Sequence, residues 1–170
     1  MTGENQSEDY LVKNSLGKMP LLELDDGTCI AESAAICRYL EEMNPNPPLM
    51  GRNPLERALV EMWHRRMELE FLIPMITIFL HTGEMWKDRV TQIPQVAETG
   101  ILNVKERMEW LDRELDGKEF ITGEDYTVAD IAAQCAFVMG KAALGLRIAE
   151  DQLNLSNWFT RVSSRPTARA

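Results

Sequence analysis

The feature that most limits how this chain can fold is a proline-rich run, Asn44-Pro45-Asn46-Pro47-Pro48. Its three prolines remove backbone donors and favour extended conformations, so neither a helix nor a central strand can continue through it. The patterns on its two sides also differ, since strand signals occur only before it. We therefore predict a domain boundary, with an N-terminal domain over 1–44, a linker over 45–52 and a C-terminal domain over 53–170.

Everything after the linker has the three- and four-residue spacing of helices. Asn53 combines with Pro54 and Glu56 as an N-cap, a first-turn proline and a capping-box partner, and so begins a long helix that Pro74 kinks rather than ends. Three more helices are expected, over Gln95 to Asp116, Val128 to Leu144 and Leu155 to Ser163. The helix over Val128 to Leu144 is apolar on most sides, which indicates the centre of a helical bundle.

Before the linker, the sequence predicts one β-hairpin between short helices. Ser7 is a candidate cap for a helix from Glu8 to Lys13, and Ser33 to Met43 has a helical apolar face. Asp26-Gly27 separates two short apolar runs and suits a two-residue hairpin turn in which both central residues have positive φ. The fold class expected is therefore α+β and mostly helical.

Composition narrows the function classes and the location. A net charge of −9 disfavours nucleic acid as a partner, because phosphate binding needs clustered Lys and Arg. No apolar stretch approaches the roughly 20 residues that a bilayer requires, and no secretory signal is visible, so we expect a cytoplasmic protein with no membrane partner. The three cysteines lack CxxC spacing, which favours reduced thiols over disulfides or a metal site.

A candidate binding segment begins at Gly17-Lys18-Met19-Pro20, directly before the first strand. A cis Met19-Pro20 bond would leave the Met19 backbone facing outward, ready to pair with a bound peptide as an added strand. The alternative is a trans proline that simply opens the strand, which the general preference for trans X–Pro bonds favours.

A second candidate pair, Glu32 and Ser33, lies where the hairpin ends and a helix begins. Free N–H groups in the first helical turn attract a carboxylate, and Glu32 can balance an ammonium group. Together they would suit the head group of an α-amino acid. The alternative is that Ser33 only caps the helix.

The run G-K-M-P followed by L-L-E-L-D-D-G-T-C-I-A-E-S resembles the glutathione-binding half of the N-terminal, thioredoxin-like domain of glutathione S-transferases, cytosolic enzymes of bacterial and fungal type among them. In that family, the residue before a cis proline pairs with the cysteinyl backbone of glutathione, and a Glu-Ser pair holds its γ-glutamyl group. The resemblance thus implies substrate-binding roles for Met19, Pro20, Glu32 and Ser33, with Lys18 near the glycyl carboxylate. It also implies glutathione as co-substrate without a permanent cofactor, a small hydrophobic electrophile as second substrate, and a homodimer.

A second match covers Phe120 to Gly123 and Tyr126 to Ile131, and it resembles the buried capping motif of the same family. In a Thr-x-x-Asp pair, Thr127 and Asp130 satisfy helix-start amides reciprocally, so their role is structural. We expect the loss of Asp130 to cost about 1 kcal/mol or more as a lost cap.

The match does not include the segment that activates the glutathione thiol in other members of the family. Members begin with a strand, a helix and a second strand of roughly 30 residues, and the first strand ends at the residue that activates the thiol. The resemblance therefore implies an N-terminally truncated member, and Tyr10 and Ser15 lie in the wrong element to replace that residue. His81, at the end of the kinked helix, is the catalytic candidate that remains, although a solvated helix-end histidine is the simpler interpretation.

Trp63, Met67, Met75 and Met85 could line an electrophile pocket, although at helical spacing they also suit a core. Three functions stay open: a glutathione S-transferase that conjugates glutathione to hydrophobic electrophiles, a non-catalytic module of the same fold that binds partners, and a piece of a longer ordinary enzyme.

Overall fold

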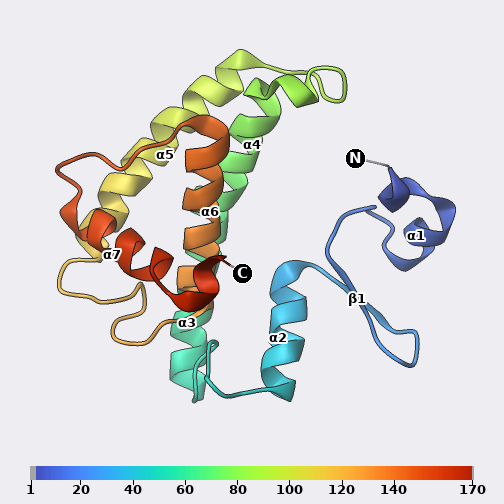
Figure 1. Ribbon diagram of the computed structural model, residues 1–170, viewed down its shortest axis with the longest axis horizontal. Helices are drawn as coiled ribbons and strands as arrows, with labels where there is room; N and C mark the ends of the chain where they lie inside the picture. Colours follow the sequence, from blue (N-terminus) through green and yellow to red (C-terminus); the bar gives the residue numbers. More distant parts are fainter. Residues whose placement is uncertain (1–2, 170) are drawn as a thin grey trace. The chain divides into compact units, whose positions relative to one another are not determined.

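The computed structural model describes residues 3–169, with the side chain of Arg169 excluded. These residues form two compact units that divide between Leu49 and Met50, inside the segment where the sequence predicts a linker. The first unit holds a two-stranded sheet and the second contains helices without a strand element among its described residues, as the expected fold class requires. Figure 1 shows the elements of each unit.

The N-terminal unit has a short helix, a hairpin and a longer helix. Ser7 caps α1 (Glu8–Lys13) by accepting the Tyr10 N–H, as predicted, after a 3-10 turn at Glu4–Gln6. Strands β1 (Leu21–Glu23) and β2 (Cys29–Ala31) pair antiparallel, and α2 (Ser33–Met43) follows directly. The predicted helix bounds of α1 and α2 are correct.

The hairpin turn differs from the two-residue turn that Asp26-Gly27 predicts. Gly27 has a φ of 85°, but Asp26 does not have a positive φ. The Leu24 carbonyl accepts the Gly27 N–H at 2.9 Å, which makes a three-residue connection ending in a left-handed glycine. Asp26 also accepts the Thr28 N–H at 2.9 Å, which stabilises this longer turn and lowers the pKa of Asp26.

The helical unit follows the predicted order. Its elements are α3 (Pro54–Met67), the π-helix η2 (Glu68–Leu72), α4 (Ile73–Thr82), the 3-10 turn η3 (Glu84–Trp86), α5 (Pro94–Glu114), α6 (Val128–Leu144), α7 (Leu153–Ser163) and the 3-10 turn η4 (Pro166–Arg169). The chain rises through α3 and α4, turns over and descends through α5, so α4 and α5 lie antiparallel (Figure 1).

The first long helix continues past Pro74, as predicted, and the turn that precedes the proline is π-helical. Pro74 has no N–H to donate, and the wider hydrogen-bond spacing of η2 lets the helix continue past it. Phe71 lies within this turn, Met67 comes just before it and Met75 follows it, and all three are fully buried.

Helix α6 is the buried centre of the helical unit. Ala129, Ala133 and Ala136 are 0% exposed, and their small side chains let neighbouring helices approach. The ring of Phe137 contacts the rings of Phe71 and Trp158, which joins α6 to η2 and α7. Burial of these apolar side chains contributes to the hydrophobic stabilisation of this unit.

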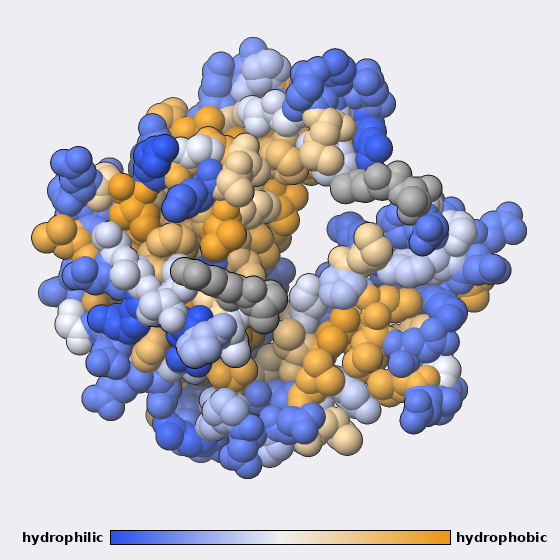
Figure 2. Space-filling model, in the orientation of Figure 1, coloured by the Kyte–Doolittle hydropathy of each residue, from blue (hydrophilic) through white to orange (hydrophobic). Residues whose placement is uncertain are grey.

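Exposed apolar side chains interrupt the hydrophilic surface on the face drawn in Figure 2. Among residues 3–169, no helix combines the length and the apolar character needed to cross a membrane.

Candidate functional site

The hairpin brings the two candidate binding segments to the same end of the sheet. Leu21 pairs with Ala31 in the register of β1 and β2. Pro20 precedes Leu21 and Glu32 follows Ala31, so the Met19–Pro20 bond and the Glu32–Ser33 pair lie beside each other. They are twelve residues or more apart in sequence, and the antiparallel register makes them neighbours.

The Met19–Pro20 peptide bond is cis, which is the less common of the two alternatives left open by the sequence. Met19 is 73% exposed. Within residues 3–169, its backbone N–H and carbonyl make no hydrogen bond. Met19 therefore offers a free donor and a free acceptor to an extended ligand.

Helix α1 holds the segment before the cis bond in place. The Lys18 carbonyl accepts hydrogen bonds from the Tyr10 hydroxyl and from the Asn14 side-chain amide, both at 2.7 Å. Asn14 is 7% exposed, and its side-chain oxygen also accepts the Leu16 N–H. The sequence analysis did not identify Asn14, although a polar residue between a helix end and a glycine typically makes such local side-chain-to-backbone hydrogen bonds.

Glu32 has a backbone conformation that side chains rarely adopt. Its φ is 67°, the one positive value among the described residues other than glycine. Such strain costs about 1–3 kcal/mol and concentrates at ligand-binding sites. Glu32, which has this strained backbone, is also one of the residues that the sequence analysis predicts to contact a ligand.

The sequence-based alternative that Ser33 caps α2 is wrong. Glu32 occupies the N-cap position and Ser33 is the first helical residue, because the first intrahelical bond runs from the Ile36 N–H to the Glu32 carbonyl. The Glu32 side chain makes no capping bond. The N–H groups of the first turn and the exposed Ser33 hydroxyl therefore remain available to an anion.

His81 has a structural contact that sequence reasoning did not anticipate. It lies near the end of α4, and its Nδ1 accepts the Ile93 N–H at 3.0 Å, at the start of α5. The Nδ1 lone pair is therefore occupied, and a neutral His81 carries its proton on Nε2. In this arrangement His81 can donate a hydrogen bond but cannot accept a proton without losing the Ile93 contact.

The four residues considered for an electrophile pocket do not form one. Trp63, Met67 and Met75 are at most 7% exposed and belong to the hydrophobic core. Met85 is 52% exposed in η3. The helical spacing of the first three reflects core packing, as the alternative interpretation held.

Asp130 has more partners than a capping role requires. The capping box with Thr127 is present, and one carboxylate oxygen accepts the Thr127 N–H at 2.9 Å. The other oxygen accepts the Ile121 N–H and the Trp158 indole N–H, each at 2.9 Å. Burial raises the pKa of Asp130, and these hydrogen bonds oppose the shift.

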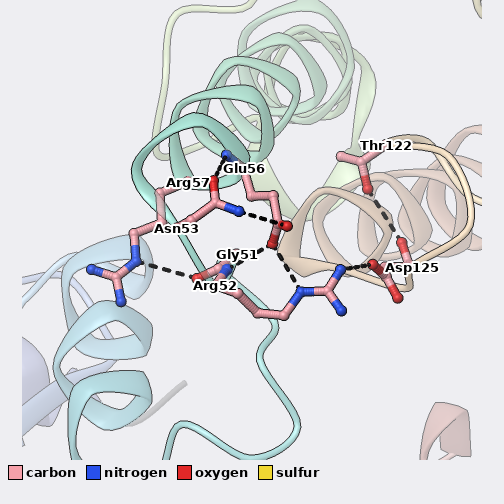
Figure 3. Close-up of polar contacts among 7 residues, drawn as sticks. All are labelled: Gly51, Arg52, Asn53, Glu56, Arg57, Thr122 and Asp125. Atoms are coloured by element: carbon pink, nitrogen blue, oxygen red, sulfur yellow. Dashed lines mark hydrogen bonds and ion pairs between the residues drawn. The ribbon is translucent and has the colours of Figure 1, made fainter.

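A polar cluster stabilises the start of α3 (Figure 3). Asn53 caps the helix by accepting the Glu56 N–H at 3.0 Å, as predicted. Glu56 accepts the backbone N–H of Arg52 at 2.9 Å, so the predicted capping box closes on the residue before the cap. The Arg52 guanidinium also contacts Asp125 at 2.5 Å, which joins this helix start to the loop before α6.

No group of three His, Cys, Asp or Glu side chains in the described part of the chain could hold a metal ion. Cys29, Cys37 and Cys135 are all free thiols.

Comparisons with known proteins point to one family. The sequence matches the family models described as glutathione S-transferase, N-terminal domain, over residues 1–42, and glutathione S-transferase, C-terminal domain, over residues 69–166. It is 31% identical to glutathione S-transferase 2 of Saccharomyces cerevisiae, covering 98% of this chain and 72% of that protein.

Two further matches are a solved structure of a transferase and a longer protein with a different name. The crystal structure of a class Gtt2 glutathione S-transferase of Vibrio parahaemolyticus is similar with a TM-score of 0.85 at 37% identity, covering 99% of this chain and 80% of the other. Elongation factor 1-gamma of Rattus norvegicus is 30% identical over 98% of this chain, which spans 36% of that protein.

Proposed function

Because this chain belongs to the glutathione S-transferase family, we propose that it binds glutathione at the end of its hairpin and conjugates the thiolate to small hydrophobic electrophiles. The observation that carries the proposal is the strand register, which sets the free backbone of Met19 beside Glu32 and Ser33. One end of the hairpin thus combines the free backbone of Met19, an anion site at Ser33 and the carboxylate of Glu32.

Each part of this edge suits one part of glutathione. The Met19 N–H and carbonyl would pair with the cysteinyl backbone, as an added strand does. The first turn of α2 and the Ser33 hydroxyl would hold the γ-glutamyl carboxylate, while Glu32 balances its ammonium group. Lys18 is exposed and suits the glycyl carboxylate.

Activation of the thiol needs a donor or a cation, since a free thiol with a pKa of about 8.5 is only slightly ionised at neutral pH. The Tyr10 hydroxyl already donates to the Lys18 carbonyl, which supports a positioning role for Tyr10. We assign His81 a donor role through Nε2, because its Nδ1 is engaged with Ile93. A donor of this kind would stabilise the thiolate by a hydrogen bond, and the proton of the thiol would pass to solvent.

Calorimetric titration of glutathione into the full chain tests the binding site. We expect Glu32→Ala to weaken binding at least about tenfold, because a hydrogen bond to a charged group contributes about 1.5–3 kcal/mol. Glu42→Ala, on the exposed surface of α2, is the matched control and should bind like the parent chain. Equal affinities of the Glu32→Ala variant and the parent chain would refute the assignment.

A non-catalytic binding module is the second candidate function. The similarity to elongation factor 1-gamma favours it, because that relative carries a segment like this chain as about a third of its length. A conjugation assay with chlorodinitrobenzene, run on the same preparations, separates the two. Turnover supports the transferase, whereas glutathione binding without turnover supports the module.

We also propose that the chain forms a homodimer through α3, η2 and α4. Large apolar residues recur there every seven positions while remaining exposed: Leu55 at 70%, Met62 at 36%, Leu69 at 48% and Ile76 at 39%. Exposed apolar surface of this kind marks protein interfaces. Sedimentation should show a dimer that Leu69→Glu dissociates, while Leu153→Glu, an exposed position on α7, leaves it intact. A monomeric parent chain would refute this interface.

A further inference from the structure

The peptide group between Lys18 and Met19 is held at one end by two side-chain donors. Its carbonyl oxygen accepts the Tyr10 hydroxyl and the Asn14 side-chain amide, each at 2.7 Å, which occupies both lone pairs. The other end of the same group is the N–H of Met19. Because a trans peptide group is planar, its C=O and N–H point in opposite directions, and fixing the carbonyl also fixes the direction of the N–H.

The preceding peptide group, between Gly17 and Lys18, is held in the same way. The Gly17 carbonyl accepts the side-chain amides of Asn5 and Gln6, at 2.6 Å and 3.1 Å. Gly17 is buried with a φ of 60°, and a Cβ atom there would lie 2.9 Å from the Asn5 carbonyl oxygen, so η1 packs directly against it. Both peptide groups that precede Met19 are thus fixed by side chains from η1, from α1 and from the residue that ends α1.

Asn14 is itself held on several sides. It is 7% exposed, and its own N–H donates to the Tyr10 carbonyl at 2.9 Å. Its side-chain oxygen accepts the Leu16 N–H at 3.3 Å while its amide nitrogen donates to Lys18. The side chain therefore cannot rotate without losing a hydrogen bond at one end, which makes it a rigid support for the Lys18 carbonyl.

Water could satisfy the Lys18 carbonyl without any side chain, because Lys18 is exposed and Met19 is 73% exposed. Two side chains converge on this oxygen instead. Within residues 3–169, the Met19 N–H at the opposite end of the peptide group makes no hydrogen bond. The contrast between a saturated acceptor and a free donor on one rigid group indicates that the two side chains orient the donor.

We propose that Asn14, together with Tyr10, is a positioning residue that directs the Met19 N–H toward the cysteinyl carbonyl of glutathione. Hydrogen bonds to the Lys18 carbonyl also polarise the peptide group, which makes its N–H a stronger donor. The inference rests on the proposed function, since glutathione is the ligand assigned to Met19 there. It gives the short helix α1 a part in ligand recognition although neither side chain contacts the ligand.

Nitrogen-15 relaxation of the Met19 amide, measured on the full chain without glutathione, tests the positioning step by itself. We expect an order parameter of about 0.85 in the parent chain and a fall toward about 0.6 in Tyr10→Phe and in Asn14→Asp, each of which removes one donor. Tyr39→Phe is the control for the first variant, because the Tyr39 hydroxyl on α2 makes no hydrogen bond within residues 3–169. Asn103→Asp, at an exposed position of α5, is the control for the second.

Calorimetric titration then tests the link to the ligand. We expect Tyr10→Phe and Asn14→Asp each to weaken glutathione binding about threefold to tenfold, since a misdirected N–H loses most of one hydrogen bond, while both controls bind like the parent chain. γ-Glutamylcysteine lacks the glycyl carboxylate assigned to Lys18. The two variants should therefore weaken its binding by the same factor if the effect arises at Met19.

The inference requires both effects, with thermal unfolding showing that each variant is folded. It is overturned if either the order parameter or the affinity of the two variants matches the controls, or if the loss of affinity disappears with γ-glutamylcysteine. The proposed function stands in those cases. A parent chain that does not bind glutathione overturns the proposed function itself and, with it, the ligand assigned to Met19. If Asn14→Asp does not fold, Tyr10→Phe, which keeps the aromatic ring, decides alone.

Discussion

The carboxylate of Asp130 accepts the indole N–H of Trp158 at 2.9 Å, and the two side chains are 0% and 1% exposed. This bond joins the start of α6 to α7, because Trp158 lies on α7, 28 residues after Asp130 in the sequence. Asp130 thus connects the helix start, the loop at Ile121 and the last long helix of the unit through one carboxylate.

Asp130→Ala should destabilise the helical unit well beyond the loss of one cap. We expect about 3 kcal/mol or more, because buried N–H groups of Ile121 and Trp158 lose their acceptor together. Trp158→Phe removes one donor only and should cost less. Chemical denaturation measures both, with Asp116→Ala as an exposed control. A cost for Asp130→Ala no greater than about 1 kcal/mol would show that the residue acts as a cap alone.

Glu32→Gly should separate folding from glutathione binding. Glycine adopts positive φ freely, so the substitution relieves strain worth about 1–3 kcal/mol against a flexibility cost of about 0.5–1 kcal/mol. We expect thermal stability to be unchanged or higher while glutathione affinity, measured by calorimetry, falls. Retained affinity would argue that the Glu32 carboxylate does not contact the ligand.

His81→Ala should lower stability by about 0.5–1.5 kcal/mol, because the Ile93 N–H loses its acceptor. His81→Asn places an oxygen near the Nδ1 position and should restore stability, whereas His81→Gln, whose polar atoms lie near Nε2, should not. Thermal unfolding and the conjugation assay are measured on all three. If His81→Asn is stable but inactive, the donor role of Nε2 is supported; full activity in that variant contradicts it.

Glu56→Gln should lower stability in a pH-dependent way. The backbone N–H of Arg52 and then its guanidinium lower the pKa of Glu56 below its usual value of 4.5. A carboxylate with a lowered folded pKa contributes stability above its unfolded pKa and loses that contribution as the pH falls through the folded pKa. The Tm difference between parent and variant should therefore be largest near pH 7. It should shrink toward zero as the pH falls below 4.5. A difference that stays constant with pH would contradict this origin.

Local signals in the sequence predicted the elements well. Ser7, Asn53-Pro54 and the Thr127–Asp130 pair mark helix starts that the structure places at the expected residues, because caps act within about one turn of the chain. The helical spacing after the proline-rich run likewise predicted an all-helical unit. Candidate ligand contacts at Met19, Glu32 and Ser33 came from the same kind of short-range pattern together with the family resemblance.

Only the tertiary structure determined the contacts between residues far apart in sequence and the conformations that these contacts impose. The strand register alone sets Met19 beside Glu32, and packing decides that Nδ1 of His81 meets Ile93 and that Asp130 meets Trp158. Such pairings carry no signature within a window of a few residues. Caps and periodicity therefore determine where this chain is helical or extended, whereas the packing of those elements determines which side chains can act together.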